Sequence, residues 1–332
     1  MSETKNESGA DKQAGWERGL LEKLALEQFR EQRISRRWNV GFKLFFAVYL
    51  VGVLIVAMGD GMGDGMRGSS GRHTALVEIE GVIGAGMDVD ADRVVTGLRA
   101  AFEEEDVVGV ILRINSPGGS PVQAGYINDE ITRLRKKYPQ RPVYAVIGDI
   151  GASGGYYIAV AADTIYVNKA SIVGSIGVLM AGFGYVDTIK KVGVERRLLT
   201  AGENKGFMDP FSPLTPDDKE HAQKMLEDIH KQFIEVVQKG RGEKLVHDQD
   251  LFSGLFWTGE QAIKLGLVDA LGSASYVARE VIGAEDIVDY TQKQDFFERI
   301  TKGFGVALVR AFQTDAFKQR IMLTLPMGGA GR

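Results

Sequence analysis

The sequence predicts an α/β domain that follows a single membrane-spanning helix. Three observations support this prediction: strand-like and helix-like segments alternate from His73 onward, an uncharged apolar run lies near the N-terminus, and glycine-rich turns directly follow strand-like segments. The chain has 332 residues, 44% of them hydrophobic, which is enough apolar material for one large or two ordinary domains.

Composition excludes several classes of function. The 44 acidic and 40 basic residues give a net charge of −4, which argues against nucleic acid as the main partner. Cysteine is absent, so disulfides, cysteine-ligated metals and a cysteine nucleophile are excluded. With only 4 histidines, a histidine-rich metal site is not expected, and the sequence implies no metal or cofactor.

The apolar run Leu44–Met58 is uncharged, and with the preceding residues back to Trp38 it is long enough to cross a bilayer as a helix. Basic residues crowd its N-terminal side, so the positive-inside rule places the N-terminus in the cytoplasm. The bulk of the chain is then expected on the periplasmic or extracellular side of the cytoplasmic membrane. A cleaved signal peptide is the alternative, because Ala57-Met58-Gly59 could be a cleavage site, but a leader of this length is too long.

The chain divides by composition into five segments. They are a polar tail (1–37), the membrane span (38–58), a Gly-rich linker (59–72), the α/β domain (73–285) and a C-terminal extension (286–332). The sequence does not decide the role of the C-terminal extension.

Hydrophobic periodicity predicts the elements of the α/β domain. Strands are expected at Thr74–Ile83, Val107–Asn115, Pro142–Gly148 and Thr164–Asn168. Helices are expected at Asp92–Glu105, Ala124–Lys137, Tyr156–Ala162, Pro216–Gly240 and Thr258–Leu265. Thr215, followed by a proline, is the expected N-cap of the long fourth helix, and Gly266 the end of the fifth.

Two glycine-rich turns carry the chemical signal. In the first, Gly118 and Gly119 follow a predicted strand, where backbone N–H groups can bind an oxyanion without interference from a Cβ atom. A plain turn is the alternative, since Pro-Gly-Gly is a common turn sequence. In the second, Ser153 lies in Gly-Ala-Ser-Gly-Gly between a strand and a helix, which is the G-x-S-x-G pattern of a hydrolase nucleophile. The alternative is a serine that only caps the helix.

A serine nucleophile needs a base. None of the four histidines lies in a comparable turn, and His221, His230 and His247 have the surroundings of solvated surface residues. A lysine with a lowered pKa is the other option, and Lys205 is the candidate because glycines and apolar residues surround it after the strand-like Arg196–Thr200. By composition alone, a solvated surface lysine remains the simpler interpretation.

Five blocks of the sequence resemble one family in order and spacing. They are RINSPGG at Arg113–Gly119, GDIGASGGYY at Gly148–Tyr157, AADTI at Ala161–Ile165, VGSIGV at Val173–Val178 and AGENKGFMDP at Ala201–Pro210. Together they resemble the signal peptide peptidase A family, also called protease IV, in its one-domain, membrane-anchored bacterial form. The resemblance covers about residues 73–272.

The resemblance implies a crotonase- or Clp-protease-like fold of repeated β-β-α units with a Ser-Lys dyad. Ser153 would be the nucleophile, Lys205 the general base and Ser175 a residue that orients the lysine, with the Gly118 and Gly119 amides as the oxyanion hole. The implied activity is the degradation of cleaved signal peptides through an acyl-enzyme. For Lys205 to be neutral, burial would have to lower its pKa by several units from about 10.4.

The resemblance also implies partners: peptide substrates, the membrane, and copies of the same chain in a ring, an octamer, in which a neighbour can supply the lysine. Whether Lys205 serves its own Ser153 or a neighbour's stays open. Three alternatives remain: a related Ser-Lys protease that acts on other membrane proteins such as stomatin relatives, a crotonase-like acyl-CoA enzyme, and a non-catalytic scaffold.

Overall fold

The computed structural model describes residues 38, 41–53 and 71–292, and these belong to two separate units. In the first unit, residues 41–53 are helical and their apolar side chains are exposed. Within the described ranges, no helix combines the length and the hydropathy that a membrane crossing requires. Part of the predicted span 38–58, most of the linker 59–72, the tail 1–37 and residues 293–332 lie outside the described residues.

The second unit is built on one eight-stranded sheet, in the order β6-β5-β3-β2-β1-β8, with β4 pairing with β3 and with β7. All pairs are parallel except β5 with β6, which confirms the predicted α/β class. The strands are β1 (His73–Ile83), β2 (Val107–Gly119), β3 (Val143–Ala152), β4 (Thr164–Val167), β5 (Ile172–Gly174), β6 (Phe256–Thr258), β7 (Ala270–Leu271) and β8 (Ile287–Asp289).

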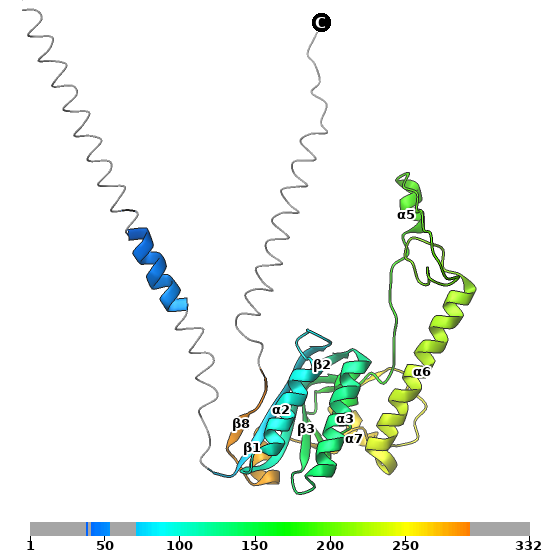
Figure 1. Ribbon diagram of the computed structural model, residues 1–332. Coiled ribbons are helices and arrows are strands. Elements are labelled where there is room, and N and C mark those ends of the chain that lie inside the picture. The colour runs from blue at the N-terminus through cyan, green and yellow to red at the C-terminus, as the bar shows by residue number, and fades with distance from the viewer. Residues whose placement is uncertain (1–37, 39–40, 54–70, 293–332) are drawn as a thin grey trace, which may run out of the picture. The chain divides into compact units, whose positions relative to one another are not determined.

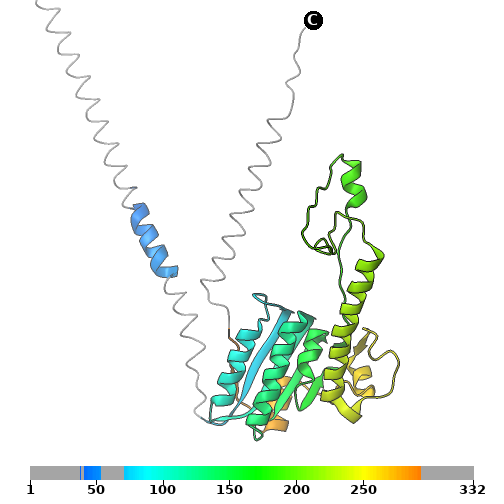
Figure 2. The same cartoon turned by 45° about the vertical axis from the view of Figure 1, so that its right-hand side comes forward.

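Helices cover both faces of the sheet. On one face, α2 and α3 lie side by side across β1–β3, as Figures 1 and 2 show, and enclose the main core. On the other face, η2 closes a smaller cluster around Leu76, Ile111 and Val146. The helices are α2 (Ala91–Glu103), α3 (Pro121–Lys137), α4 (Gly154–Ala159), α5 (Val186–Lys191), α6 (Pro216–Arg241), η1 (Gly242–Lys244), α7 (Gly259–Lys264), α8 (Ala274–Tyr276) and η2 (Val277–Ile282).

Local capping sets the helix ends, and the long predicted helix is confirmed. Thr215 and Asp218 form a capping box at the start of α6, with Pro216 in its first turn. The helix α3 begins at Pro121, three residues before the predicted start, because the Ser120 side chain accepts a hydrogen bond from the Gln123 N–H.

Three predicted strands differ from the structure. The strand expected at Pro142–Gly148 starts one residue later and continues to Ala152 as β3. The strand expected at Val107–Asn115 continues through the Pro-Gly-Gly sequence as β2, because Gly118 and Gly119 pair with Val82 and Ile83 of β1. The strand-like segment Arg196–Thr200 is not a strand, since it is exposed and pairs with no other strand. A short strand-like run does not form a strand where it pairs with no neighbouring strand.

Residues 179–214, which we call the arm, contain α5 and extend beyond the N-terminal end of α6, away from the sheet (Figures 1 and 2). The arm exposes large apolar side chains: Leu179 is 82%, Phe183 78% and Leu199 96% exposed. Soluble surfaces seldom present so many neighbouring apolar residues, and such a surface is typical of one that binds another protein or a membrane.

The other end of α6 is fixed to the sheet. Arg241, almost fully buried, donates a bidentate pair of hydrogen bonds to Asp269 at 2.8 and 3.0 Å and a third to the Gly266 carbonyl at 2.9 Å. Burial alone would raise the pKa of Asp269, but hydrogen bonds from Arg241, Lys244 and the Ile165 N–H lower it to about 2. The C-terminal end of α6 is therefore anchored by a compensated buried charge.

Candidate active site

Ser153 is the single residue between β3 and α4, and its backbone is strained. Its φ of 51° and ψ of −122° lie in a region that residues with a Cβ atom rarely adopt. The Ser153 N–H donates to the Gly174 carbonyl at 2.9 Å, which holds the turn against β5. The side chain caps no backbone group of α4 and is partly exposed at the wall of a pocket. The helix-capping interpretation of this serine is therefore wrong.

Ser175 lies directly after β5 and lines the same pocket. Its φ is 52°, and its N–H donates to the Leu255 carbonyl at 2.7 Å. In the described ranges, Ser153, Ser175 and Met208 are the only residues other than glycine with positive φ. Strain of this kind concentrates at functional sites, so two of the three strained residues coincide with predicted site residues.

The glycine pair at the end of β2 contacts the turn at Ser153, and because Gly118 and Gly119 are paired with β1, the plain-turn interpretation of this pair is wrong. A Cβ atom at Gly118 would lie 2.7 Å from the Ser153 Cβ and 2.8 Å from the Gly154 nitrogen, closer than van der Waals contact allows. With a φ of 102°, Gly118 also occupies a region that favours glycine. The structure thus brings the predicted oxyanion turn against the predicted nucleophile.

The two amides of this glycine pair have different surroundings. The Gly118 N–H donates to the Ser116 hydroxyl at 3.1 Å, and Gly118 is buried. Gly119 is exposed and lines the pocket, and its nitrogen lies 3.3 Å from where a Gly154 Cβ would be. Of the two amides, that of Gly119 is the better placed to bind an oxyanion.

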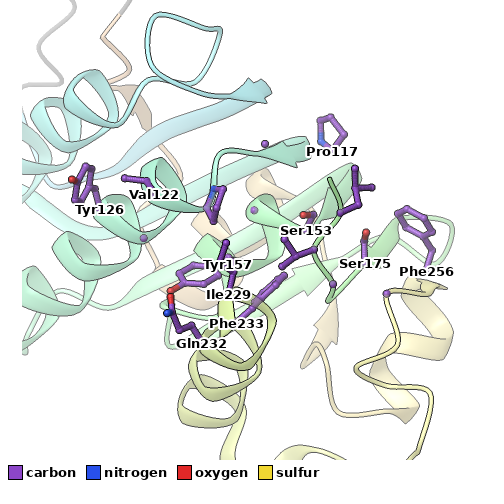
Figure 3. A pocket seen from close by; sticks show the side chains of 18 of the residues that line it. Pro117, Val122, Tyr126, Ser153, Tyr157, Ser175, Ile229, Gln232, Phe233 and Phe256 are labelled. Atoms are coloured by element: carbon purple, nitrogen blue, oxygen red, sulfur yellow. The ribbon is translucent and has the colours of Figure 1, made fainter. Parts of the chain in front are cut away.

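The pocket is a cavity of about 860 Å³ between α3, α6 and the turns around the two serines. Figure 3 shows Ser153 between Ser175 and Phe256 on one side and Tyr126 on the other. Its lining is mostly apolar and includes Val122, Tyr126, Tyr157, Ile229, Phe233 and Phe256. A mostly apolar cleft with a few convergent polar groups is typical of a ligand site.

Lys205 does not line this pocket, and no Lys, Arg or His is among the described residues that do. It lies in the arm and is exposed, so a single chain does not supply the apolar setting expected for it. The Phe207 ring packs edge-on against His221 of α6, with centroids 5.4 Å apart. This contact ties the lysine segment to the N-terminal part of α6, while the pocket lies against Ile229, Gln232 and Phe233 farther along the same helix.

His230 is half-buried, and its Nε2 lies 3.0 Å from the Ile176 carbonyl oxygen. The expectation that it is a solvated surface residue is therefore wrong, because α6 packs against the segment that follows Ser175. No described group of His, Asp or Glu side chains has the arrangement of a metal site.

Two features of the site were not predicted from the sequence: the wall that α3 contributes to the pocket, and the role of Ser116. Val122, Tyr126 and Asp129 recur at helical spacing on α3 and all line the pocket. That spacing was available in the sequence as a second, partly apolar helix face. The α6 side of the groove had no comparable signal, because its position depends on tertiary packing.

Comparisons with known proteins bear on this site. Residues 135–287 match the profile of a family described as "Peptidase family S49". A putative protease of Synechocystis sp. is 32% identical over 205 residues, which cover 62% of this chain and 72% of that protein. A putative signal peptide peptidase SppA of Enterococcus faecium is 30% identical over 210 residues, covering 63% of this chain and 60% of that protein.

A third relative matches this chain over only a small part of its own length. A Na⁺/H⁺ antiporter NhaA of Brucella abortus is 46% identical over 186 residues, which cover 56% of this chain but 25% of the antiporter. The chain therefore spans a quarter of that protein's length and 60–72% of the other two.

Proposed function

Because the chain belongs to peptidase family S49, we propose that it is a serine endopeptidase in which Ser153 is the nucleophile. The observation that carries this proposal is the strained Ser153, partly exposed in the pocket and in van der Waals contact with the Gly118–Gly119 turn. A nucleophile on a tight turn beside a backbone N–H donor is the arrangement that acyl transfer requires.

The oxyanion of the tetrahedral intermediate would bind the Gly119 N–H. Ser116 supports this assignment because its hydroxyl accepts from the Gly118 N–H and donates to the Gly81 carbonyl at 2.7 Å. These two bonds fix the turn through a buried side chain, so its shape does not depend on substrate. A preorganised donor stabilises developing charge without reorganisation during the reaction.

The general base would be Lys205 of a second copy of the chain. Three observations support this: the pocket lacks a basic side chain among its described residues, Lys205 is exposed on the arm, and the arm exposes apolar residues that a partner would cover. The proposed assembly is a closed ring of identical chains, such as an octamer, in which each arm reaches its neighbour. Ser175 of the receiving chain would orient the incoming lysine amine.

In this scheme the neutral lysine accepts the Ser153 proton while the hydroxyl oxygen attacks the peptide carbonyl. The lysine then returns the proton to the leaving amine, and water hydrolyses the acyl-enzyme. Docking of the arm would remove water from the lysine, which lowers the pKa of an amine.

The substrates we propose are cleaved signal peptides, since most of the residues that line the pocket are apolar. The proposed location is the outer face of the cytoplasmic membrane, anchored by residues 38–58. The exposed apolar side chains of helical residues 41–53 support an anchoring role, because an aqueous surface would leave them uncovered. For the fold, we propose the crotonase- or Clp-protease-like class, which the parallel sheet and its β-α alternation support.

A peptide-cleavage assay tests this function. The full chain in detergent should cleave a synthetic signal peptide, and Ser153→Ala and Lys205→Ala should each lower kcat by several orders of magnitude, because nucleophile and base act as a unit. Lys264→Ala, at the end of α7 and outside the pocket, is the matched control and should keep full activity. Equal activity of wild type and Ser153→Ala would contradict the proposal.

A further inference from the structure

We propose that Asp129 forms a subsite for a cationic side chain, lysine or arginine, of the bound peptide. This inference rests on the proposed peptidase function and deepens it by naming a specificity-determining residue. Asp129 is the only charged side chain among the described residues that line the pocket. The charge therefore faces a groove whose other walls are apolar or neutral.

The Asp129 carboxylate has no ion pair or hydrogen bond with any described residue. The neighbouring Glu130 carboxylate accepts hydrogen bonds from Arg133 and Arg99 at 2.7 to 2.8 Å. These bonds, chiefly those from Arg133, lower the pKa of Glu130 to about 2. Arg133, four residues after Asp129, would otherwise be its natural helical partner. Because Glu130 engages Arg133, the charge of Asp129 remains available to a ligand.

Aromatic rings lie on the same side of α3. Val122, Tyr126 and Asp129 share one face of the helix, and Tyr157 packs against Phe233 with ring centroids 5.1 Å apart. Tyr157 and Asp129 line the same pocket. Burial, and then the Asp129 charge, raises the pKa of the Tyr157 hydroxyl. An aromatic wall that ends in a carboxylate can hold the methylene stem of a lysine and attract its ammonium group.

The distance along α3 limits which side chain can reach the subsite. Val122 and Asp129 are seven residues apart, which is about 10 Å of helix. An extended peptide covers that distance with about three residues. Figure 3 places Tyr126 on the far side of Ser153 from Ser175 and Phe256. Asp129 follows Tyr126 by three residues on the same pocket-lining face of α3, so the subsite lies on the Tyr126 side of the pocket. One peptide position on that side of the scissile bond should therefore show a charge preference.

Binding measured without catalysis tests the subsite separately from the proposed activity. The probe is the full chain carrying Ser153→Ala, titrated into fluorescent apolar peptides in which Lys, norleucine or Glu occupies each position in turn. At one position, Lys should bind about five times more tightly than Glu, which is the range expected for a solvent-accessible charge pair. Norleucine should be intermediate, and 0.5 M salt should reduce the difference.

Asp129→Asn in the same background should abolish the difference, and Asp129→Lys should reverse it. Glu103→Gln, an exposed carboxylate of α2 outside the pocket, removes the same charge and should leave the preference intact. Equal binding of Lys and Glu peptides at every position, or a preference that survives Asp129→Asn, would overturn the subsite. If the wild-type chain cleaves no peptide while the binding preference remains, only the proposed peptidase function is overturned.

Discussion

The Ser116 hydroxyl accepts a hydrogen bond from the Gly118 N–H at 3.1 Å and donates one to the Gly81 carbonyl at 2.7 Å. One buried side chain thus links β1 to the turn that touches Ser153. The amides of Gly118 and Gly119 look equivalent in the sequence, but they differ in the structure. The Gly118 N–H has a hydrogen-bond partner within the chain, whereas Gly119 faces the pocket.

Replacing Ser116 with Ala should impair both stability and catalysis. The buried Gly118 N–H and the partly buried Gly81 carbonyl lose their partner, so the free energy of unfolding should fall by about 1–3 kcal/mol and kcat should fall with little change in KM. Urea unfolding and steady-state kinetics measure the two effects. Ser120→Ala, which removes the cap of α3 instead, should lower stability by about 1 kcal/mol and leave kcat unchanged. A parallel loss of kcat in Ser120→Ala would show that Ser116 acts through stability alone.

A methyl group at Gly118 should inactivate the site. It would clash with Ser153 and with the Gly154 nitrogen, and neither can move without displacing the nucleophile. We expect Gly118→Ala to lower kcat/KM by at least about a hundredfold, the cost typical of losing an oxyanion donor. Gly125→Ala, also at the pocket but with no heavy atom within 4 Å of its Cβ position, is the control and should raise the melting temperature slightly. Full activity of Gly118→Ala would contradict the proposed geometry.

Mixing two inactive variants should restore activity. If each site takes its lysine from a neighbour, a ring assembled from equal amounts of Ser153→Ala and Lys205→Ala chains has both groups intact at roughly a quarter of its sites. The measurement is peptide cleavage after the two proteins are unfolded together and reassembled. Each variant reassembled alone is the control. A mixture as inactive as its components would place the lysine in the same chain as the serine.

Acid should weaken the anchor of α6. The pKa of Asp269 is about 2 in the folded chain, below the value of about 3.9 for an unfolded aspartate. The stabilisation is therefore complete above about pH 5, begins to fall near the unfolded pKa and is lost as the pH falls through the folded pKa. At pH 7, Asp269→Asn leaves the buried Arg241 without its counter-charge and should cost about 3–5 kcal/mol. Urea titrations at pH 7 and pH 3 should show the two proteins converging; a constant difference would contradict the role of the pair.

The sequence predicted those parts of the site that depend on short-range rules. The strand-turn-helix around Ser153 and the cap at Thr215 follow from glycine placement and capping chemistry, and both are present. The position of Asp129 in the wall of the pocket was not predicted. A charged residue on an amphipathic helix is expected to face solvent, and only the packing of α6 opposite α3 places it in a pocket. Short-range rules could not predict the position of Lys205. The arm that carries it buries none of its α5 residues, and in the proposed assembly the surroundings of Lys205 depend on a second chain.

The lack of a basic side chain among the described residues of the pocket has a consequence for regulation. Under the proposed arrangement, a newly made chain carries a complete nucleophile and no means to activate it. Proteolysis would begin only when copies meet, so the local density of chains in a membrane would act as the switch. Dilution should then silence the enzyme without unfolding it, a form of latency that needs no propeptide and no inhibitor.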